Sequence, residues 1–460
     1  MEENDYLDNI GNDKHSNDQI VDAILNGVVS FKNLQGTGEF LNSRQKEVRA
    51  LLNQKDDEAF ATANSVSDVN SIYELQNYLK AFPDGNHIAE VNAKIKKILD
   101  EAERIKEEQE ERERLLREIK HNINEYTIDE IIDKLSESDL YKLCNDLEID
   151  FQIIKDFEEP KITFNPIPRK ENEVPIGYTD VFFWGIPSSG KTCALSAILS
   201  TIKNDYSMEA PDCNIKFGAT YITSLANIFR KDIGYLPDRT NEDRTQYMPF
   251  LFYKRGEKNK RRISFFELSG EVFKSFYEKV NDTKIIEDKD RDGIEQSFKT
   301  LELLLNSSNQ KIHFFFIDYN QETKNSIDKE TGLTQSDYLE AATIYFRDNN
   351  DILTKKTDAV YVIVTKSDEI QADDNKQRIE KAKVFLDHNF GNFMDVLQNQ
   401  CNKNSVQFGV KLFSIGDVYF KRICKINRAS SINIINDLLG QVNPISNNNW
   451  WSAIIRFFNR

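Results

Sequence analysis

Short apolar runs, separated by long helical or polar stretches, dominate the second half of the chain. Runs of this length indicate buried strands, and strands that alternate with helices are typical of a mostly parallel sheet covered on both faces. The pattern therefore predicts an α/β fold for this part of the chain. The runs lie at 181–184, 250–253, 263–266, 312–317, 359–364 and 410–414.

The N-terminal part of the chain carries a helical pattern instead. Apolar residues recur at helical spacing through 57–99, with a proline–glycine turn at 82–85, and we expect a long helix over 95–123. The run at 107–113 is charged on all sides of the expected helix, which favours a solvated connecting helix over a coiled coil. The sequence TIDE at 127–130 has the form of a capping box and predicts a further small helical segment.

The turn at 78–85, YLKAFPDG, resembles the short bacterial tetratricopeptide-like repeats whose turn reads YL-x-x-FP-x-G, although one good copy is visible. Four of the ten prolines then fall between 160 and 175, where helices cannot persist, and they mark the main domain boundary. We therefore divide the chain into a flexible tail (1–30), a helical tetratricopeptide-like region (31–100), a long charged helix with a small helical segment (101–159), a proline-containing linker (160–177), the α/β domain (178–445) and an aromatic C-terminal tail (446–460).

Composition narrows the classes of function. The chain has 460 residues, with 60 Lys and Arg against 76 Asp and Glu, so its net charge is −16. This acidic balance argues against nucleic acid as a partner, because contacts to a phosphate backbone need clustered positive charge. The five cysteines form no CxxC pair, which suggests neither a zinc ribbon nor a thioredoxin-type site. The N-terminus lacks the apolar core of a signal peptide and no apolar run approaches the about 20 residues of a membrane span, so we expect a cytoplasmic protein.

A phosphate-binding motif follows the first apolar run of the α/β domain. The sequence GIPSSGKT at 185–192 matches GxxxxGK[ST], with a strand pattern before it and a helical pattern after it. In that order the backbone N–H groups of the loop wrap the phosphates, and the helix N-terminus adds partial positive charge. We expect Lys191 to reach the β- and γ-phosphates and the Thr192 hydroxyl to bind Mg²⁺. The nucleotide contacts expected here are Gly185, Ser188, Ser189, Gly190, Lys191, Thr192 and Cys193.

The run at 359–364 ends in Thr365-Lys366-Ser367-Asp368, and here the sequence resembles the Ras-like P-loop GTPases, whose guanine-reading motif is [NT]KxD. The resemblance implies that Asp368 accepts hydrogen bonds from the N1–H and the exocyclic amine of guanine, while the stem of Lys366 lies across the base. Adenine offers no such donor pair, so the motif favours GTP and GDP. Ser414 and Ile415 stand where the family has a small-residue turn that contacts the base, although the sequence departs from the commoner S-A-K form.

The family's second switch, D-x-x-G, corresponds to Glu267-Leu268-Ser269-Gly270, with Glu267 in place of the usual Asp. The resemblance implies that Glu267 holds Mg²⁺ through a bound water and that Gly270 offers its N–H to the γ-phosphate. Glu271 falls where many relatives place a catalytic glutamine. A carboxylate there adds negative charge beside a phosphate, which predicts slow hydrolysis.

The first switch should precede an antiparallel strand pair formed by 248–253 and 262–266. We expect Thr240 to be the γ-phosphate and Mg²⁺ sensor, with Thr245 as second choice, and Arg239 as an internal arginine finger. Asp318, at the end of the run 312–317, is interpreted as a polar strand terminus.

The resemblance implies a Ras-like fold, with six strands of which one is an antiparallel edge strand, and Mg²⁺-dependent GTP binding with slow hydrolysis. Changes in 235–245 and 267–280 would be relayed to a protein partner, which also engages the N-terminal helical region. The sequence ELSGE at 267–271 resembles large bacterial GTPases, and a bias to Asn, Lys, Ile and Phe suggests an AT-rich bacterial genome. Two other functions stay open: a GTP-binding scaffold with little hydrolysis, and an ATPase of the P-loop class in which TKSD is accidental.

The C-terminal tail offers one further contact. Trp450, Trp451, Ile454, Ile455 and Phe458 form one face at helical spacing. Such a face packs on its own domain, in the groove of a partner, or on a membrane surface. A homodimer is also compatible with the sequence.

Overall fold

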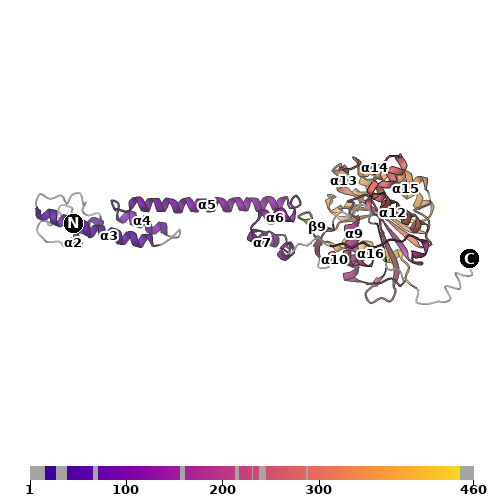
Figure 1. Ribbon diagram of the computed structural model, residues 1–460, viewed down its shortest axis with the longest axis horizontal. Helices are drawn as coiled ribbons and strands as arrows, with labels where there is room; N and C mark the ends of the chain where they lie inside the picture. The colour runs from indigo at the N-terminus through magenta and orange to yellow at the C-terminus, as the bar shows by residue number, and fades with distance from the viewer. Residues whose placement is uncertain are drawn as a thin grey trace, which may run out of the picture. The chain divides into compact units, whose positions relative to one another are not determined.

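A computed structural model describes most of the chain (Figure 1). The described residues are 16–26, 39–65, 71–155, 161–212, 217–229, 232–237, 245–285, 288–349 and 351–445. The aromatic tail 446–460, Arg239 and Thr240 lie outside them. The chain divides into two compact units, 1–121 and 122–460.

In the first unit, every secondary-structure element that the structure describes is a helix. They are α2 (Asn17–Leu25), α3 (Glu39–Asn64), α4 (Ser71–Ala81) and α5 (Ile88–His121). The hydroxyl of Tyr78 on α4 donates to the carboxylate of Asp56 on α3, and the second oxygen of this carboxylate accepts from the N–H of Asn86, which lies between α4 and α5, at 2.6 Å. A Cβ atom on Gly85 would lie 2.7 Å from the Tyr78 hydroxyl, so this turn has no space for a larger residue.

The long charged helix expected over 95–123 is α5, which begins seven residues earlier, at Ile88. Every residue from 103 to 114 is exposed. This part of α5 is therefore solvated on all sides within its unit, as the charge pattern predicts. The boundary that the sequence analysis placed between 100 and 101 falls inside this helix, and the tetratricopeptide-like assignment of 31–100 stays a prediction.

A seven-stranded sheet organises the second unit, with the strand order β2-β4-β5-β1-β6-β7-β8. Neighbours from β5 through β8 are parallel, whereas β4 is antiparallel to both β5 and β2. The strands are β1 (Thr179–Trp184), β2 (Tyr206–Glu209), β4 (Gln246–Lys254), β5 (Arg261–Glu267), β6 (Gln310–Asp318), β7 (Thr357–Thr365) and β8 (Gln407–Phe413).

The prediction of an α/β fold with a mostly parallel sheet is confirmed, and so is the antiparallel pair, which β4 and β5 form. The prediction of six strands with one antiparallel strand at the edge is wrong. The short strand β2 pairs outside β4, so that the antiparallel strand β4 lies inside the sheet. β2 is a four-residue strand with half-buried side chains, and its sequence, YSME, lacks the apolar run that marks the others.

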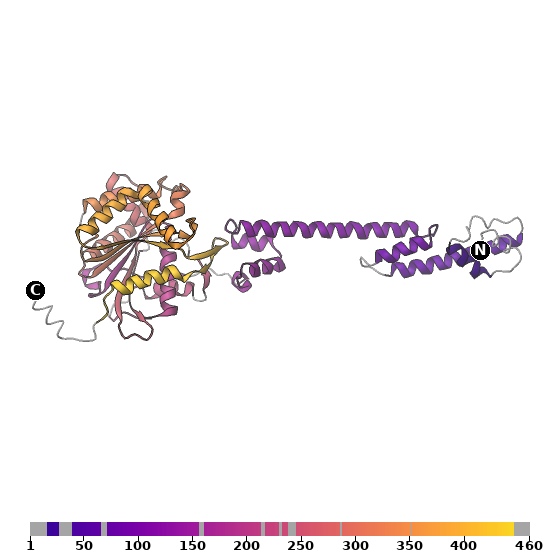
Figure 2. The ribbon, with the colours of Figure 1, turned by 180° about the vertical axis from the view of Figure 1, so that it is seen from behind.

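Helices cover both faces of the sheet (Figure 2). One face carries α9 (Lys191–Asp205), α10 (Ala219–Ile228) and α16 (Arg428–Gln441), and the other carries α11 (Gly270–Asn281), α12 (Asp288–Asn306), α14 (Gln335–Asp348) and α15 (Asn375–Lys403). Side chains of β1 alternate between the two: Val181 and Phe183 face the first group, and Phe182 and Trp184 the second.

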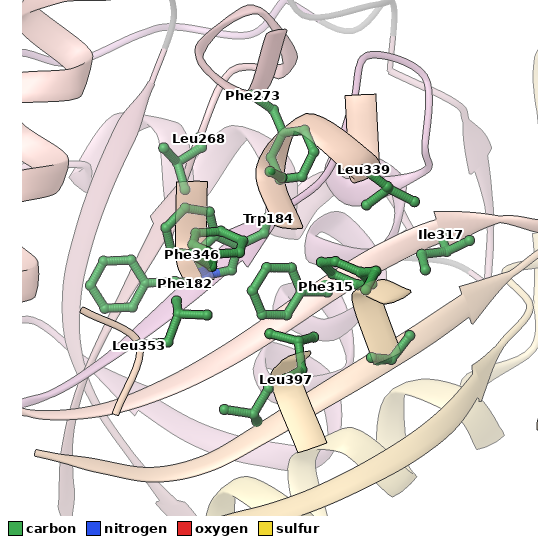
Figure 3. Packing of buried hydrophobic residues seen from close by; sticks show 14 of the residues in the cluster. Phe182, Trp184, Leu268, Phe273, Phe315, Ile317, Leu339, Phe346, Leu353 and Leu397 are labelled. Carbon is green, nitrogen blue, oxygen red and sulfur yellow. The ribbon is translucent and has the colours of Figure 1, made fainter. Parts of the chain in front are cut away.

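Aromatic rings fill much of the hydrophobic core between the sheet and the second group of helices, α11, α12, α14 and α15 (Figure 3). The Trp184 ring lies 5.5 Å from that of Phe315 and 5.6 Å from that of Phe346. Its indole N–H donates to the Nδ1 atom of His313, at 3.0 Å. Because β1 is buried on both faces, its end, where the phosphate-binding motif begins, is held firmly in place.

A second, three-stranded antiparallel sheet was not predicted. It has the order β3-β10-β9, from β3 (Ile233–Tyr235), β9 (Gly416–Tyr419) and β10 (Ile423–Ile426). Three short helices also belong to this unit, namely α6 (Ile128–Lys134), α7 (Glu137–Asp146) and α8 (Phe151–Lys155). The capping box predicted at Thr127 is present, since its hydroxyl accepts from the Glu130 N–H. In the described part of the chain, no helix has the length and apolar character that a membrane crossing needs.

Candidate nucleotide-binding site

The phosphate-binding motif forms the turn between β1 and α9. Gly185 and Gly190 have φ angles of +144° and +87°, a region that favours glycine. A Cβ atom on Gly185 would also lie 2.8 Å from the carbonyl oxygen of Phe316. The two glycines are therefore required by the backbone path, and α9 begins directly at Lys191.

Lys191 is buried inside this turn. Its ammonium group donates to the carbonyl oxygens of Gly185, at 2.6 Å, and Ile186, at 2.7 Å. Burial lowers the pKa of Lys191 to about 8, against the opposing effect of the Glu267 and Glu271 carboxylates. A dehydrated ammonium held by neutral oxygens, of which the third is the Ser189 hydroxyl at 3.5 Å, is prepared to receive an anion. It lines a cavity of about 220 Å³ bounded by residues 187–193, Pro237, Gly270 and Glu271.

The predicted guanine motif lies directly beside this turn. Thr365, the last residue of β7, donates from its hydroxyl to the carbonyl oxygen of Ser189 at 2.9 Å. The methyl group of Thr365 lies 3.4 Å from where a Cβ on Gly190 would be. The segments 185–192 and 365–368, separated by some 175 residues of sequence, thus meet at the carboxyl ends of their strands.

Asp368 lies in the short helical turn η3 (Ser367–Glu369) and lines a second cavity, of about 510 Å³. Gly190 and Cys193 belong to the walls of both cavities. The volume of the larger cavity suits a purine with its ribose, and that of the smaller cavity suits phosphates. The lining residues are Asn124, Gly190, Cys193, Leu236, Asn320, Thr365, Lys366, Asp368, Glu369, Phe413, Ile415, Gly416, Asp417, Val418 and Tyr419.

Of the two residues predicted to contact the base, Ile415 and Ser414, one lines the larger cavity and the other does not. Ile415 lines the larger cavity. Ser414 instead supports the turn, since its N–H donates to the Ser430 hydroxyl and its own hydroxyl accepts from the Gly416 N–H. The continuation of this turn into β9 adds further wall residues that the sequence analysis missed, because 416–419 shows no strand signal of its own.

Glu267 ends β5 and is completely surrounded. One of its carboxylate oxygens accepts from the Thr192 hydroxyl, and the other accepts from the Tyr221 hydroxyl at 2.6 Å. Burial raises the pKa of Glu267, and the two hydrogen bonds and Lys191 oppose that rise. The longer side chain of Glu reaches Thr192 directly. Together they offer two adjacent oxygen ligands of the kind that Mg²⁺ prefers, so the residues fit the metal that the sequence implies.

Gly270 and Glu271 open α11, next to the phosphate cavity. A Cβ atom on Gly270 would lie 2.3 Å from the Pro187 nitrogen, so only glycine fits there. Glu271 forms an ion pair with Lys274 at 3.0 Å, and Lys274 forms a second with Asp328 at 2.8 Å. Burial alone would lower the pKa of Lys274, but the bonds to Asp328 and Glu271 outweigh it and raise that pKa. The charge of the Glu271 carboxylate is therefore partly offset by a buried cation, which also pairs with Asp328 and Glu330.

The two candidates for the first switch differ in outcome. Thr240 lies outside the described residues, so its role stays a prediction. Thr245 is buried, and its hydroxyl accepts from the Ser269 N–H at 3.3 Å. That bond connects the end of the predicted first switch, 235–245, to the start of the predicted second switch, 267–280. Pro237, three residues before Thr240, lines the phosphate cavity.

Two supporting residues escaped the sequence analysis. Tyr221 carries no motif and lies on α10, 46 residues from its partner Glu267. Asp318 ends β6, as the sequence predicted, and it is also fully buried and pairs with the Lys366 ammonium at 2.7 Å, a role that the sequence did not indicate. Its other carboxylate oxygen accepts from the Asn320 N–H. Lys366 itself has a φ of +53°, so the ion pair holds a corner that is unusual for a side-chain-bearing residue.

The strand order and the loop between β1 and α9 define an α/β protein with a phosphate-binding loop. No protein-family model and no curated protein matches the sequence. The similar solved structures include the signal recognition particle receptor SRb-GTP/SRX complex from Chaetomium thermophilum, with 15% identity over 53% of this chain and 94% of that chain and a TM-score of 0.26. Another is a protein described as nucleolar GTP-binding protein 1 from Plasmodium falciparum, with 10% identity, coverage of 52% and 79%, and a TM-score of 0.22. These values are too low to carry a conclusion about function, which rests on the site itself.

Proposed function

We propose that this protein is a GTP-binding switch of the Ras-like P-loop class, which hydrolyses GTP slowly and relays its nucleotide state to a protein partner. One observation carries the proposal: the hydrogen bond from Thr365 to Ser189 brings the phosphate-binding turn and the TKSD segment to adjoining cavities. A protein that binds a nucleoside triphosphate needs one site for the phosphates and a second, adjoining site for the purine.

The phosphates would occupy the smaller cavity. There the Lys191 ammonium would exchange the carbonyl oxygens of Gly185 and Ile186 for phosphate oxygens. A negative phosphate is a stronger partner than a neutral carbonyl, so this exchange supplies binding energy. Thr192 and Glu267 would hold Mg²⁺, which neutralises charge on the β- and γ-phosphates when bound.

The base would occupy the larger cavity, against Asp368. A carboxylate there accepts two hydrogen bonds from the N1–H and the exocyclic amine of guanine, whereas adenine offers no such pair of donors. If the protein is instead an ATPase of the P-loop class, Asp368 should have no influence on the preference between GTP and ATP. Competition between GTP and ATP for the purified protein separates the two.

Hydrolysis would proceed by attack of a water oriented near Glu271. The ion pair with Lys274 reduces the repulsion between this carboxylate and a phosphate, but it also engages the carboxylate that would orient the water. Slow hydrolysis is expected. The same ion pair favours the alternative of a GTP-binding scaffold, and a single-turnover assay in which bound GTP persists for hours would support that alternative.

The central experiment is mass spectrometry of the nucleotide that copurifies with the protein, followed by an Asp368→Asn variant. We expect GTP or GDP in the wild type and a preference for xanthosine triphosphate in the variant, because the amide donates where the carboxylate accepts. An unchanged preference would remove the guanine assignment. Lys191→Ala should abolish nucleotide binding in every reading.

The partner is expected to read the segments 235–245 and 267–280 and the N-terminal helices. A cytoplasmic location, a homodimer, and a partner or membrane contact through 446–460 belong to the same proposal. Deletion of 448–460 tests the last point, since unchanged binding to liposomes and partners would exclude an anchoring role.

A further inference from the structure

The three-stranded sheet stands at both nucleotide cavities. Its strand β9 supplies 416–419 to the wall of the larger cavity. Its strand β3 leads directly into Leu236, which lines the larger cavity, and Pro237, which lines the smaller one. The middle strand β10 pairs with both, and the Leu236 N–H donates to the Arg422 carbonyl oxygen at 2.6 Å. The three-stranded sheet and the two residues that follow β3 therefore contribute to the walls of both cavities.

The helical segment 122–155, which contains α6, α7 and α8, contacts this same sheet. Lys425 of β10 forms an ion pair with Glu148 at 2.8 Å. On β3, the Tyr235 hydroxyl donates to the backbone carbonyl of Ile153. The segment also reaches the larger cavity itself, where Asn124 is one of the lining residues.

We propose that the segment 122–155 is a lid on the base cavity, in which Asn124 contributes an amide to the bound nucleotide and the three-stranded sheet holds the lid in place. This inference rests on the proposed function, since it concerns the release of the guanine nucleotide. An asparagine amide carries both donors and an acceptor, so it suits the edge of a base or a ribose. Separation of the lid from the sheet would remove this contact and make release of the nucleotide faster.

The same geometry couples the lid to the phosphates. The contact from Ile153 falls on Tyr235, and the chain continues from there to Pro237 at the phosphate cavity. A displacement of the first switch after loss of the γ-phosphate would therefore pull on the strand that holds α8. A nucleotide-dependent change of conformation would therefore reach the segment 122–155 through β3.

The test measures the release of a fluorescent GDP analogue from the full-length protein. Glu148→Lys places two cations opposite each other, and Asn124→Ala removes the amide. Because the Glu148–Lys425 pair is largely exposed, we expect release to become about two- to fivefold faster in Glu148→Lys. The double variant Glu148→Lys with Lys425→Glu restores the attraction with its sign reversed, and we expect its release rate to return to that of the wild type.

Glu380→Lys is the matched control. Glu380 is an exposed carboxylate that pairs with Lys383 at 3.1 Å on α15, so the change in charge is the same and the lid is untouched. Unchanged release in both Glu148→Lys and Asn124→Ala, with guanine nucleotide still bound, would overturn the lid and leave the proposed function intact. Equal acceleration by the control, or no recovery in the double variant, would also overturn it. A wild type that binds no guanine nucleotide would instead refute the proposed function, and the lid with it.

Discussion

The Thr365 hydroxyl donates a hydrogen bond to the Ser189 carbonyl oxygen at 2.9 Å, and this bond connects the two segments that form the candidate nucleotide site. The same hydroxyl lies 3.3 Å from the carbonyl oxygen of Ile317, at the end of the neighbouring strand β6. Thr365 thus ties together the ends of three parts of the fold, at the edge of the sheet where parallel strands present their carboxyl ends.

Replacement of Thr365 by valine keeps the shape and removes the donor. The buried Ser189 carbonyl then lacks this partner, and we expect a loss of about 1–3 kcal/mol in the free energy of unfolding, together with weaker nucleotide binding. Urea denaturation and titration with a fluorescent GDP analogue measure the two effects. Thr365→Ser, which retains the hydroxyl, should lose much less of both, and equal losses in the two variants would contradict the role of the hydrogen bond.

Asp318 should act on nucleotide binding through Lys366. Asp318→Asn keeps an oxygen that accepts from the Asn320 N–H but removes the charge that holds the Lys366 ammonium. We expect about tenfold weaker GDP binding, which corresponds to about 1.4 kcal/mol. A double-mutant cycle with Lys366→Met measures the coupling. The double variant should bind no more weakly than Lys366→Met alone, whereas strictly additive losses would show that the two residues act independently.

Tyr221 should tune the affinity for Mg²⁺. Tyr221→Phe removes the hydrogen bond that orients one oxygen of Glu267, and outer partners of this kind typically change metal affinity by about tenfold or more. The measurement is the Mg²⁺ dependence of GDP-analogue release. Tyr247→Phe is the control, because the Tyr247 hydroxyl also donates to a buried carboxylate, that of Asp180 near the start of β1. A similar Mg²⁺ response in both variants would argue against a metal-directed role.

His313 should make stability fall in acid. Burial, with a smaller contribution from Lys311, lowers the pKa of His313 to about 3, and its Nδ1 accepts from the Trp184 indole, so the folded protein holds it neutral. The unfolded chain takes up a proton near pH 6.5. This contribution is complete above about pH 6.5 and is lost, by at most about 1.4 kcal/mol per pH unit, as the pH falls toward 3.

Urea denaturation at pH 7.5 and pH 5 measures this dependence. His313→Asn provides a non-titrating oxygen in place of Nδ1 and should lose stability at pH 7.5 but show a smaller decrease between the two pH values. An equal decrease in the wild type and the variant would assign the acid sensitivity to other groups.

Local patterns were enough to predict that the motif at 185–192 forms a turn between a strand and a helix and that TKSD begins at the end of a strand. Each lies at the end of a strongly apolar strand, and the residues of the turn are dictated by nearby backbone geometry, as with Gly185 and Gly190. The strand–helix alternation likewise predicted the parallel part of the sheet. Capping at Thr127 is a third local feature, since all of its hydrogen bonds span three residues.

Features that join distant segments could not be read in this way. The edge strand β2 and the three-stranded sheet are formed by four- and three-residue strands, too short for any periodic signal. The partners of Glu267 and Lys366, which are Tyr221 and Asp318, are ordinary residues 46 and 48 positions away. The sequence by itself determined which residues are the candidates for binding phosphate and guanine, because the motifs that mark them are local and chemical. Only the tertiary structure decided which buried groups support them, because a hydrogen bond or ion pair between distant positions exists only once the packing of the sheet has brought its two atoms together.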